Sequence, residues 1–311
     1  MIPKGRITRR ILQIVPTLIL VTIAVFLMVR LLPGDPVTTM LGDRGTPAAI
    51  ARLRAQMGLD GSLAWQFWSF VRRLAQGDLG DSVVRRVSVS SLIADRLPVT
   101  LYLTVFAGVL AVVFAVPLAF VAAVFRDRWP DLLIRGLFQV GLSAPVFYVG
   151  LLLLGFFAAR WHLFPVGGMG DGFFDSARHL FLPAVTLALS LSAILMRNLR
   201  SAIVGVLRAD YIGFARAKGL SPVIVLGRHV LRNALVSAVA LFGLNIGTLL
   251  GGAIVTEYVF AVPGVGALMI ESITGRDYPV VQGMTLVLAV LVSLVFLATD
   301  VIETQLDPRS A

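Results

Sequence analysis

The sequence predicts an all-α integral membrane protein with six transmembrane helices and with both termini on the cytoplasmic side. Of the 311 residues, 58% are hydrophobic and 14% are charged, whereas soluble domains are about 45–50% apolar and about 25% charged. Six apolar runs are each close to or above the ~20 residues that cross a hydrocarbon core. The basic residues lie mostly in short clusters between these runs, an arrangement that sets membrane orientation.

The first transmembrane helix is expected at 11–32, after a cytoplasmic segment at 1–10 that is rich in basic residues. Together they resemble a secretory signal peptide, but the apolar run is too long for one and no small-residue cleavage site follows it. We therefore predict an uncleaved helix. Arg30 lies near its end, where a long charged side chain can reach the polar interface.

Residues 33–98 are the most polar part of the chain and are expected to form an extended extracytoplasmic region. Pro33 and Pro36 end the first helix because proline interrupts helical hydrogen bonding. The arginines of this region do not contradict the orientation, since long loops do not follow the positive-inside rule.

The remaining spans are expected at 99–125, 132–159, 180–200, 231–256 and 280–303, with a cytoplasmic tail at 304–311. The short connections on the predicted cytoplasmic side carry most of the arginines and Lys218, and the longest of them is 201–230. Apart from the long region 33–98, the outer connections, which include 257–279, carry only Arg160, Arg178 and Arg276. This asymmetry predicts the orientation.

The composition argues against several classes of function. Cysteine is absent and the three histidines lie far apart, so we expect no metal site and no thiol chemistry. Neither Lys4 nor Lys218 lies in a phosphate-binding glycine loop, so this chain is not expected to bind ATP by that route. No catalytic constellation and no basic face with interleaved aromatic residues are visible, which argues against an enzyme and against nucleic-acid binding. Carboxylates are scarce at mid-span positions, which disfavours an ion-coupled secondary carrier.

The connection at 201–230 has the signals of a short helix. Asp210 is a suitable N-cap, Arg216 and Lys218 fall in the last turn, and Gly219 can take the left-handed position that ends a helix. Ser221 followed by Pro222 then favours a new helix start. Such a helix would lie across the membrane face, where it would bind either anionic lipid or another protein.

The fifth span carries Gly243, Gly247 and Gly251 at every fourth position, which makes one helix face nearly flat. That face is expected to pack against another helix, either of this chain or of a partner subunit. Asn245 and Thr248 lie near the same face, where they would form interhelical hydrogen bonds or line a polar passage.

Short segments similar to the motifs of one known family occur over nearly the whole chain, in the same order as in that family. The segment from Asp210 to Leu220, continued by the segment from His229 to Leu235, resembles the cytoplasmic coupling loop of permease subunits in the dipeptide, oligopeptide and nickel family of ABC importers. Further segments resemble landmarks of the same family: Leu32–Val37, Gly77–Ser82, Arg96–Leu101, Glu257–Phe260, Pro263–Gly266, Arg276–Pro279 and Asp307–Arg309. The extended outer loop after the first span is similar to the first of the two permeases, the dipeptide/oligopeptide permease B type. The chain departs from the general pattern at Gly213, where an acidic residue is usual, and at Ser237, where proline is usual.

The resemblance implies the type I ABC importer permease fold, with the permease core at 99–303, in the cytoplasmic membrane of a prokaryote. It implies four kinds of protein partner or ligand besides membrane lipid: a second homologous permease, two ABC ATPases that bind ATP and magnesium, an extracytoplasmic substrate-binding protein, and a short peptide as substrate. Nickel or another small solute is the alternative substrate, and no cofactor is expected on this chain itself. The implied ATPase-docking residues are Asp210, Tyr211, Phe214, Ala215, Arg216, Ala217, Lys218, Gly219 and Leu220. The implied outer-gate residues are Glu257, Pro263, Gly264 and Asp277.

Overall fold

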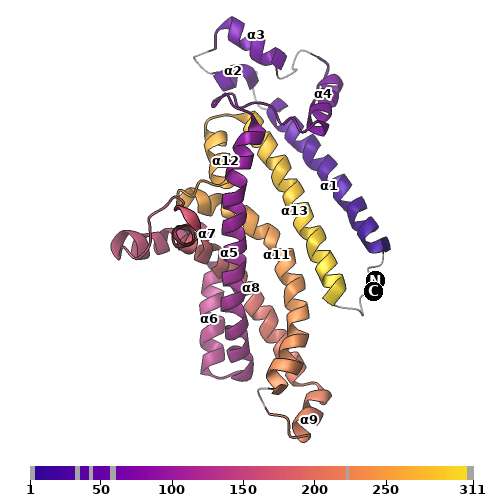
Figure 1. Cartoon of the computed structure of the whole chain (residues 1–311), viewed down its shortest axis with the longest axis vertical. Coiled ribbons are helices and arrows are strands. Elements are labelled where there is room, and N and C mark those ends of the chain that lie inside the picture. The colour runs from indigo at the N-terminus through magenta and orange to yellow at the C-terminus, as the bar shows by residue number, and fades with distance from the viewer. Residues whose placement is uncertain (1–3, 32–35, 42–44, 57–60, 222–223, 307–311) are drawn as a thin grey trace.

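The computed structural model describes residues 4–31, 36–41, 45–56, 61–221 and 224–306. Within these residues the chain consists of helices and their connections, and a single β-bridge joins Asp81 to Ser88. The helices form an elongated bundle (Figure 1). We name the two ends of the bundle after the short helices there, as the α9 end (Asp210–Ala217) and the α12 end (Val265–Thr274).

The first long helix, α1 (Lys4–Arg30), is followed by three short helices that cover the α12 end (Figure 1): α2 (Pro36–Leu41), α3 (Pro47–Gln56) and α4 (Leu63–Ala75). Helix α4 packs on the last turn of α1, where the Phe26 and Phe67 rings are 5.1 Å apart. Arg30 lies over the Phe26 ring and donates a hydrogen bond of 2.9 Å to Gln66 of α4. The charge at the end of α1 is therefore held by α4.

The next long helix, α5 (Val89–Val124), begins earlier than the apolar run predicted at 99–125. Ser88 caps it, and its hydroxyl oxygen accepts a hydrogen bond from the Ser91 N–H. A favourable N-cap stabilises a helix by about 1 kcal/mol, so the helix begins inside the polar region. Five buried alanines recur at every fourth position of α5, and they join the main core with residues of α8 (Gly172–Leu207): Ala107, Ala111, Ala115, Ala119 and Ala123. Small residues at this spacing let the backbones of α5 and α8 approach closely.

The single helix expected at 132–159 is instead bent through 105°. Its first arm is α6 (Trp129–Ser143), and its second is α7 (Val146–Leu153), which continues as the π-helical η2 (Leu154–Arg160). Pro145 lies at the bend, and Ala144 before it has the extended backbone (φ −78°, ψ 134°) that a following proline favours. Hydropathy is continuous across the bend, so the apolar run alone did not reveal it.

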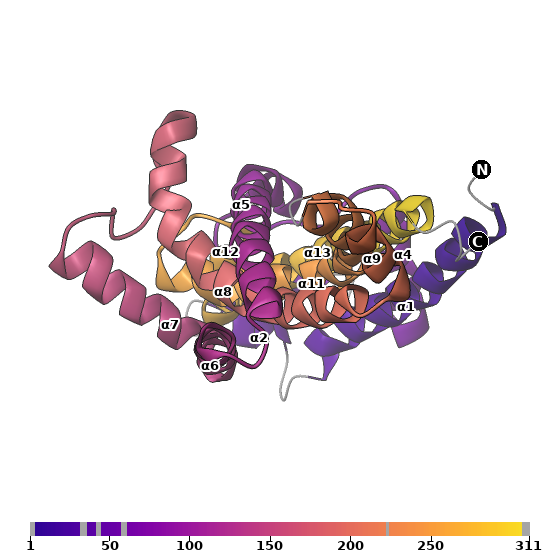
Figure 2. The ribbon, with the colours of Figure 1, turned by 90° about the horizontal axis from the view of Figure 1, so that it is seen from below.

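The remaining elements are η3 (Val225–Leu231), α11 (Arg232–Val259) and α13 (Tyr278–Leu306). Helix α11 packs between α8 and α13, and α1 packs against α13. The Gln282 side chain of α13 donates a buried hydrogen bond of 2.7 Å to the Val25 carbonyl of α1. Seen from below, α7 and α1 lie toward opposite sides of the bundle (Figure 2).

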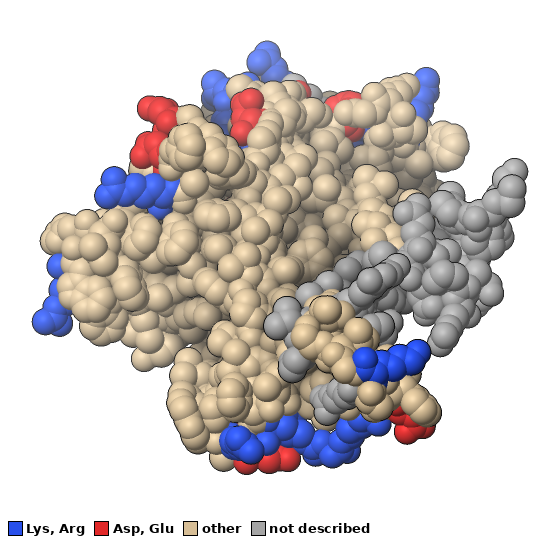
Figure 3. Space-filling model, turned by 60° about the horizontal axis from the view of Figure 1, so that its bottom comes forward, with Lys and Arg blue, Asp and Glu red and all other residues tan. Residues whose placement is uncertain are grey.

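Within the described residues, five helices are long and apolar enough to cross a membrane, and the bent pair α6–α7 makes up to six. The five lie at Leu12–Arg30, Val89–Val124, Gly172–Leu207, Leu241–Val259 and Tyr278–Ile302. On the face shown in Figure 3, most charged side chains lie toward the ends, and a broad region between them is uncharged. This distribution is that of a chain whose middle is solvated by hydrocarbon.

Candidate functional site

Helix α9 projects from one end of the bundle and is joined to α8 by a turn of two residues (Figure 1). The N–H groups of Arg208 and Ala209 donate to carbonyls of the last turn of α8, so hydrogen bonds hold the connection in place. Gly219 has φ +76°, which confirms the left-handed conformation predicted for it. Helix α9 lies where the signals of a short helix predicted it, but Asp210, predicted as its N-cap, is the first residue of the helix.

One residue of α9 anchors it to the bundle. Ile212 is 1% exposed and belongs to the core cluster that also contains Ile203 of α8 and Val225 and Val230 of η3. Sequence reasoning missed this anchor, because a single isoleucine in a polar segment carries no periodic signal.

The opposite side of α9 is open. Phe214 is 71% exposed and Tyr211 is 44% exposed, and Ala217, Lys218 and Leu220 are also exposed. Residues of α9 and of the turn before it surround a hollow of about 630 Å³. The side chains of Ala215 and Arg216 lie outside the described part of the structure. An exposed aromatic surface beside a hollow at the tip of a bundle suits a protein partner.

A new helical segment starts after Ser221, as predicted. The Ser221 hydroxyl oxygen accepts from the Ile224 N–H at 3.5 Å, and its carbonyl accepts from the Val225 N–H at 3.1 Å. Pro222 lies outside the described residues. The turns that follow are π-helical before α11 begins.

The glycine face of α11 packs within this chain. A methyl group on Gly243 would lie 1.8 Å from Cγ2 of Thr299, and one on Gly247 would lie 3.1 Å from the Phe296 ring. Both neighbours belong to α13, so at these two positions the partner helix is the chain's own. Around Gly251 a methyl group would meet no atom within 4 Å.

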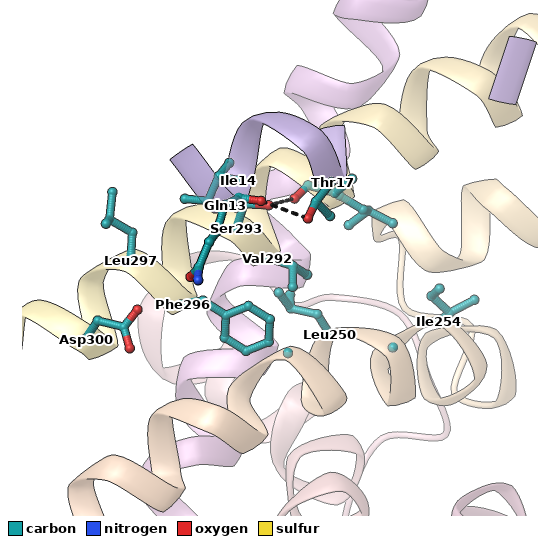
Figure 4. A pocket seen from close by; sticks show the side chains of 14 residues that line it. Gln13, Ile14, Thr17, Leu250, Ile254, Val292, Ser293, Phe296, Leu297 and Asp300 are labelled. Carbon is teal, nitrogen blue, oxygen red and sulfur yellow. Dashed lines mark hydrogen bonds between the residues drawn. The ribbon is translucent and has the colours of Figure 1, made fainter. Parts of the chain in front are cut away.

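Gly247 and Gly251 line a cavity of about 510 Å³ between α1, α11 and α13 (Figure 4). Its walls are mainly apolar, with Gln13, Thr17 and Ser293 among the polar residues. Asn245 and Thr248 are not among its lining residues. Their side chains donate to carbonyls of α11 itself, at 2.7 and 2.5 Å.

At the other end of the bundle, Glu257 ties the end of α11 to the start of α12. Its carboxylate is fully buried, and Oε2 accepts from the N–H groups of Gly266 at 2.7 Å and Ala267 at 3.2 Å. The Thr100 hydroxyl of α5 accepts from the Val265 N–H at 2.9 Å. Oε1 of Glu257 has no hydrogen-bond partner among the residues described. Oε2 thus satisfies two of the N–H groups that the first turn of α12 leaves without a partner in the helix.

This close approach requires the two glycines beside it. A methyl group on Gly264 would lie 2.3 Å from the Glu257 carboxyl, and one on Gly266 would lie 2.3 Å from the backbone of Ile254. Pro263 directly precedes the Gly264 N-cap. We call Glu257, Thr100, Gly264 and Gly266 the α12 clasp.

Asp277 fastens the loop 77–88 at the other end of α12. Its buried carboxylate accepts from the Ser82 hydroxyl and from the N–H groups of Val83 at 3.1 Å and Val84 at 3.4 Å. Its own N–H donates to the carbonyl of Ser272 in α12. Four of the predicted outer-gate residues, Glu257, Pro263, Gly264 and Asp277, therefore lie around one short helix. Sequence reasoning did not single out Thr100 and Ser82, although it recognised the segments that contain them.

Replacing Asp277 by alanine is expected to release the loop 77–88. The buried Ser82 hydroxyl and the partly buried Val83 N–H would lose their acceptor, and an unpaired buried donor costs about 1–3 kcal/mol. Hydrogen exchange should therefore accelerate at 82–84. The matched control is Arg85→Ala, which removes only the exposed ion pair with Glu271 and should change stability by about 0–1 kcal/mol. Unchanged exchange in Asp277→Ala would contradict the assignment.

Comparisons with known proteins agree on one type of membrane protein. The family described as "Binding-protein-dependent transport system inner membrane component" matches residues 115–311, and its N-terminal counterpart matches residues 5–104. The glutathione transport system permease protein GsiC of Salmonella paratyphi A is 41% identical over 302 residues, covering 97% of each chain. The protein of the same name from Escherichia coli (strain K12) is 40% identical over the same length, again covering 97% of each chain.

Solved structures show the same fold at low identity. An inward-facing form of the MetNI methionine ABC transporter superposes with a TM-score of 0.57 and 19% identity, over 70% of this chain and 97% of that one. An amino acid ABC transporter crystallised with histidines has a TM-score of 0.51 and 18% identity, over 71% of this chain and 94% of that one.

Proposed function

This chain belongs to the family of binding-protein-dependent transport system inner membrane components and is therefore a permease subunit of an ABC importer. We propose that it carries short peptides and that a separate ATPase docks on α9. ATP and magnesium are then bound by the ATPase subunits, and this chain contributes no catalytic group. A second permease completes the pathway, and an extracytoplasmic binding protein delivers the substrate.

The observation that carries the docking proposal is the two-sided character of α9. Ile212 fastens the helix to α8 and η3, while Phe214 and Tyr211 are exposed beyond the bundle. A partner that pushes on the exposed side would therefore move the end of α8. Arg126, Arg128, Arg208 and Lys218 lie at this end, which supports a cytoplasmic α9 end by the positive-inside rule.

The proposed substrate class rests on the relatives. GsiC is a glutathione permease, and glutathione is a peptide. The α12 end, covered by α2, α3 and α4, is then the outer face on which the binding protein docks. Peptide identity is tested by mass spectrometry of the ligand that co-purifies with the binding protein of the same system. Recovery of a nickel complex in place of a peptide would refute this substrate class.

Truncating the exposed side of α9 is expected to remove the ATPase. The double variant Phe214→Ala/Lys218→Ala removes the aromatic side chain that the bound ATPase would bury. Loss of such an interface residue typically costs about 2 kcal/mol or more of binding free energy, so co-purification of the ATPase should fall by about tenfold or more. Gly219→Pro should act in the same direction, because proline cannot adopt the positive φ of Gly219.

The matched control is Phe174→Ala, since Phe174 is also highly exposed but lies in the first turn of α8, at the end of that helix opposite to α9. It should leave ATPase recovery unchanged. If both phenylalanine variants retained the ATPase at the parent level, docking on α9 would be ruled out.

A further inference from the structure

The ion pair between Asp131 of α6 and Arg200 of α8 has the geometry of a rigid joint. Arg200 donates from Nε to Oδ1 at 2.6 Å and from Nη2 to Oδ2 at 2.5 Å. Asp131 also accepts from the Asp127 N–H at 2.9 Å, and Arg135 lies 3.2 Å away. The Asp131 side chain is completely buried, and the Arg200 side chain is 16% exposed. A two-point guanidinium–carboxylate pair fixes orientation as well as distance.

This joint is the best-buried attachment of α6. Within α6, all of whose residues are described, Asp131 is the one buried residue. Ile134 and Phe138 pack partly against the core, while Trp129, Leu132, Leu133, Leu137 and Val140 are exposed. The charge pair in the first turn of α6 is therefore its one fully buried attachment to α8, beside the partly buried packing of Ile134 and Phe138.

Arg200 lies close to the part of α8 that carries α9. Helix α8 ends at Leu207, and α9 begins after two further residues. Ile203, one turn beyond Arg200, packs in the same cluster as Ile212 of α9. A displacement of α9 therefore reaches Arg200 through a short, continuously packed segment.

At its other end α6 leads through the Pro145 bend into α7, and α7 packs against the end of α11, close to the α12 clasp. A methyl group on Gly150 of α7 would lie 3.1 Å from the Phe260 ring and 3.3 Å from Thr186 of α8. Phe260 comes three residues after Glu257, and its N–H donates to the Thr256 carbonyl of α11. Helices α6 and α7 together thus connect the end of α8 to the junction of α11 with α12.

We propose that the Asp131–Arg200 pair is a positioning device that makes α6 move with the end of α8, so that a displacement of α9 is transmitted through the bend to α7 and the α12 clasp. This inference rests on the proposed docking of an ATPase at α9. It deepens that proposal, because it names the residues that relay the motion.

Energetics favour positioning over stability as the role of the pair. Replacing a buried ion pair by apolar residues of similar size is often neutral or stabilising, whereas removing one partner alone is costly. An apolar pair would therefore hold α6 with comparable stability but without a fixed orientation. Spatial continuity alone does not show transmission, so the test must measure motion.

The test uses the absence of cysteine from this chain, so that within it only two introduced cysteines can carry spin labels. Leu137→Cys on α6 and Leu294→Cys on α13 replace exposed residues in the complete complex with its ATPases and second permease. The distance between the labels is measured by pulsed electron resonance without nucleotide and after trapping with ATP and vanadate. The parent is expected to show a nucleotide-dependent change in distance.

In Asp131→Leu/Arg200→Met the change in distance is expected to be lost while the complex still assembles. Arg200→Lys keeps the charge but not the two-point geometry, and it should reduce the change by about half or more. Because this conservative variant retains an ion pair, it also serves if the double variant does not accumulate.

The inference is overturned if the parent shows no change, if the double variant retains the full change, or if Arg200→Lys behaves as the parent does. Failure of the proposed function would look different, because the ATPases would then be recovered equally with the parent and with the α9 variants.

Discussion

Replacing Glu257 by alanine is expected to undo the attachment of α12 and to destabilise the full-length chain more than Asp277→Ala does. The N–H groups of Gly266 and Ala267 would lose their buried acceptor, and each such loss costs about 1–3 kcal/mol. The free energy of unfolding should therefore fall by about 2–6 kcal/mol. The loss is measured by thermal unfolding in detergent and by hydrogen exchange across α12.

Two further variants distinguish the contribution of the hydrogen bonds from those of the carboxylate charge and of the close steric fit. Glu257→Gln keeps one oxygen that can accept both N–H groups, so it should cost less than about 1.5 kcal/mol. Gly264→Ala should be severe alone, since its methyl group would lie 2.3 Å from the carboxyl, but much milder when Glu257 is already alanine. If Gln were as harmful as Ala, the carboxylate charge rather than the capping bonds would be the essential feature.

Replacing Gly243 by alanine is expected to force α11 and α13 apart. The new methyl group would lie 1.8 Å from Cγ2 and 2.5 Å from Cβ of Thr299, far closer than side chains can approach. Overpacking of this kind costs about 1–3 kcal/mol, so both the unfolding temperature and the yield of folded chain should fall. Thr299→Gly removes all three contacts and should partly rescue Gly243→Ala.

The control lies two turns further along the same helix face. Gly251→Ala adds the same methyl group where no atom lies within 4 Å, so it should change stability by less than about 0.5 kcal/mol. Equal destabilisation at Gly243 and Gly251 would contradict close packing against Thr299 as the cause, since alanine has a higher helix propensity than glycine at both positions.

The features that could be predicted from the sequence are those decided by neighbouring residues. The short helix α9, the left-handed Gly219 and the new start at Ser221 each depend on caps and turn residues within a few positions. The apolar runs likewise predicted where the long helices lie, because the hydrocarbon core imposes a minimum length.

Features that depend on distant parts of the chain could not be predicted in this way. The bend at Pro145 lies inside an uninterrupted apolar run, where a proline is also compatible with a gently kinked helix. The contact of Glu257 with the start of α12, and that of Asp277 with Ser82, join segments whose spacing in the sequence carries no periodicity. The pairing of Asp131 with Arg200 likewise depends on the packing of α6 beside α8, which the sequence does not show.

The bend between α6 and α7 also determines the parity of the membrane crossings. With 15 residues, α6 extends only about 22 Å along its axis, too short for a hydrocarbon core of about 30 Å, so α6 alone makes no passage. If α6 and α7 together make one, the described residues cross the membrane six times, and an even number would place the beginning of α1 and the end of α13 in one aqueous compartment. If the bent pair instead re-enters on the side from which it came, the crossings number five and the two ends would face opposite compartments.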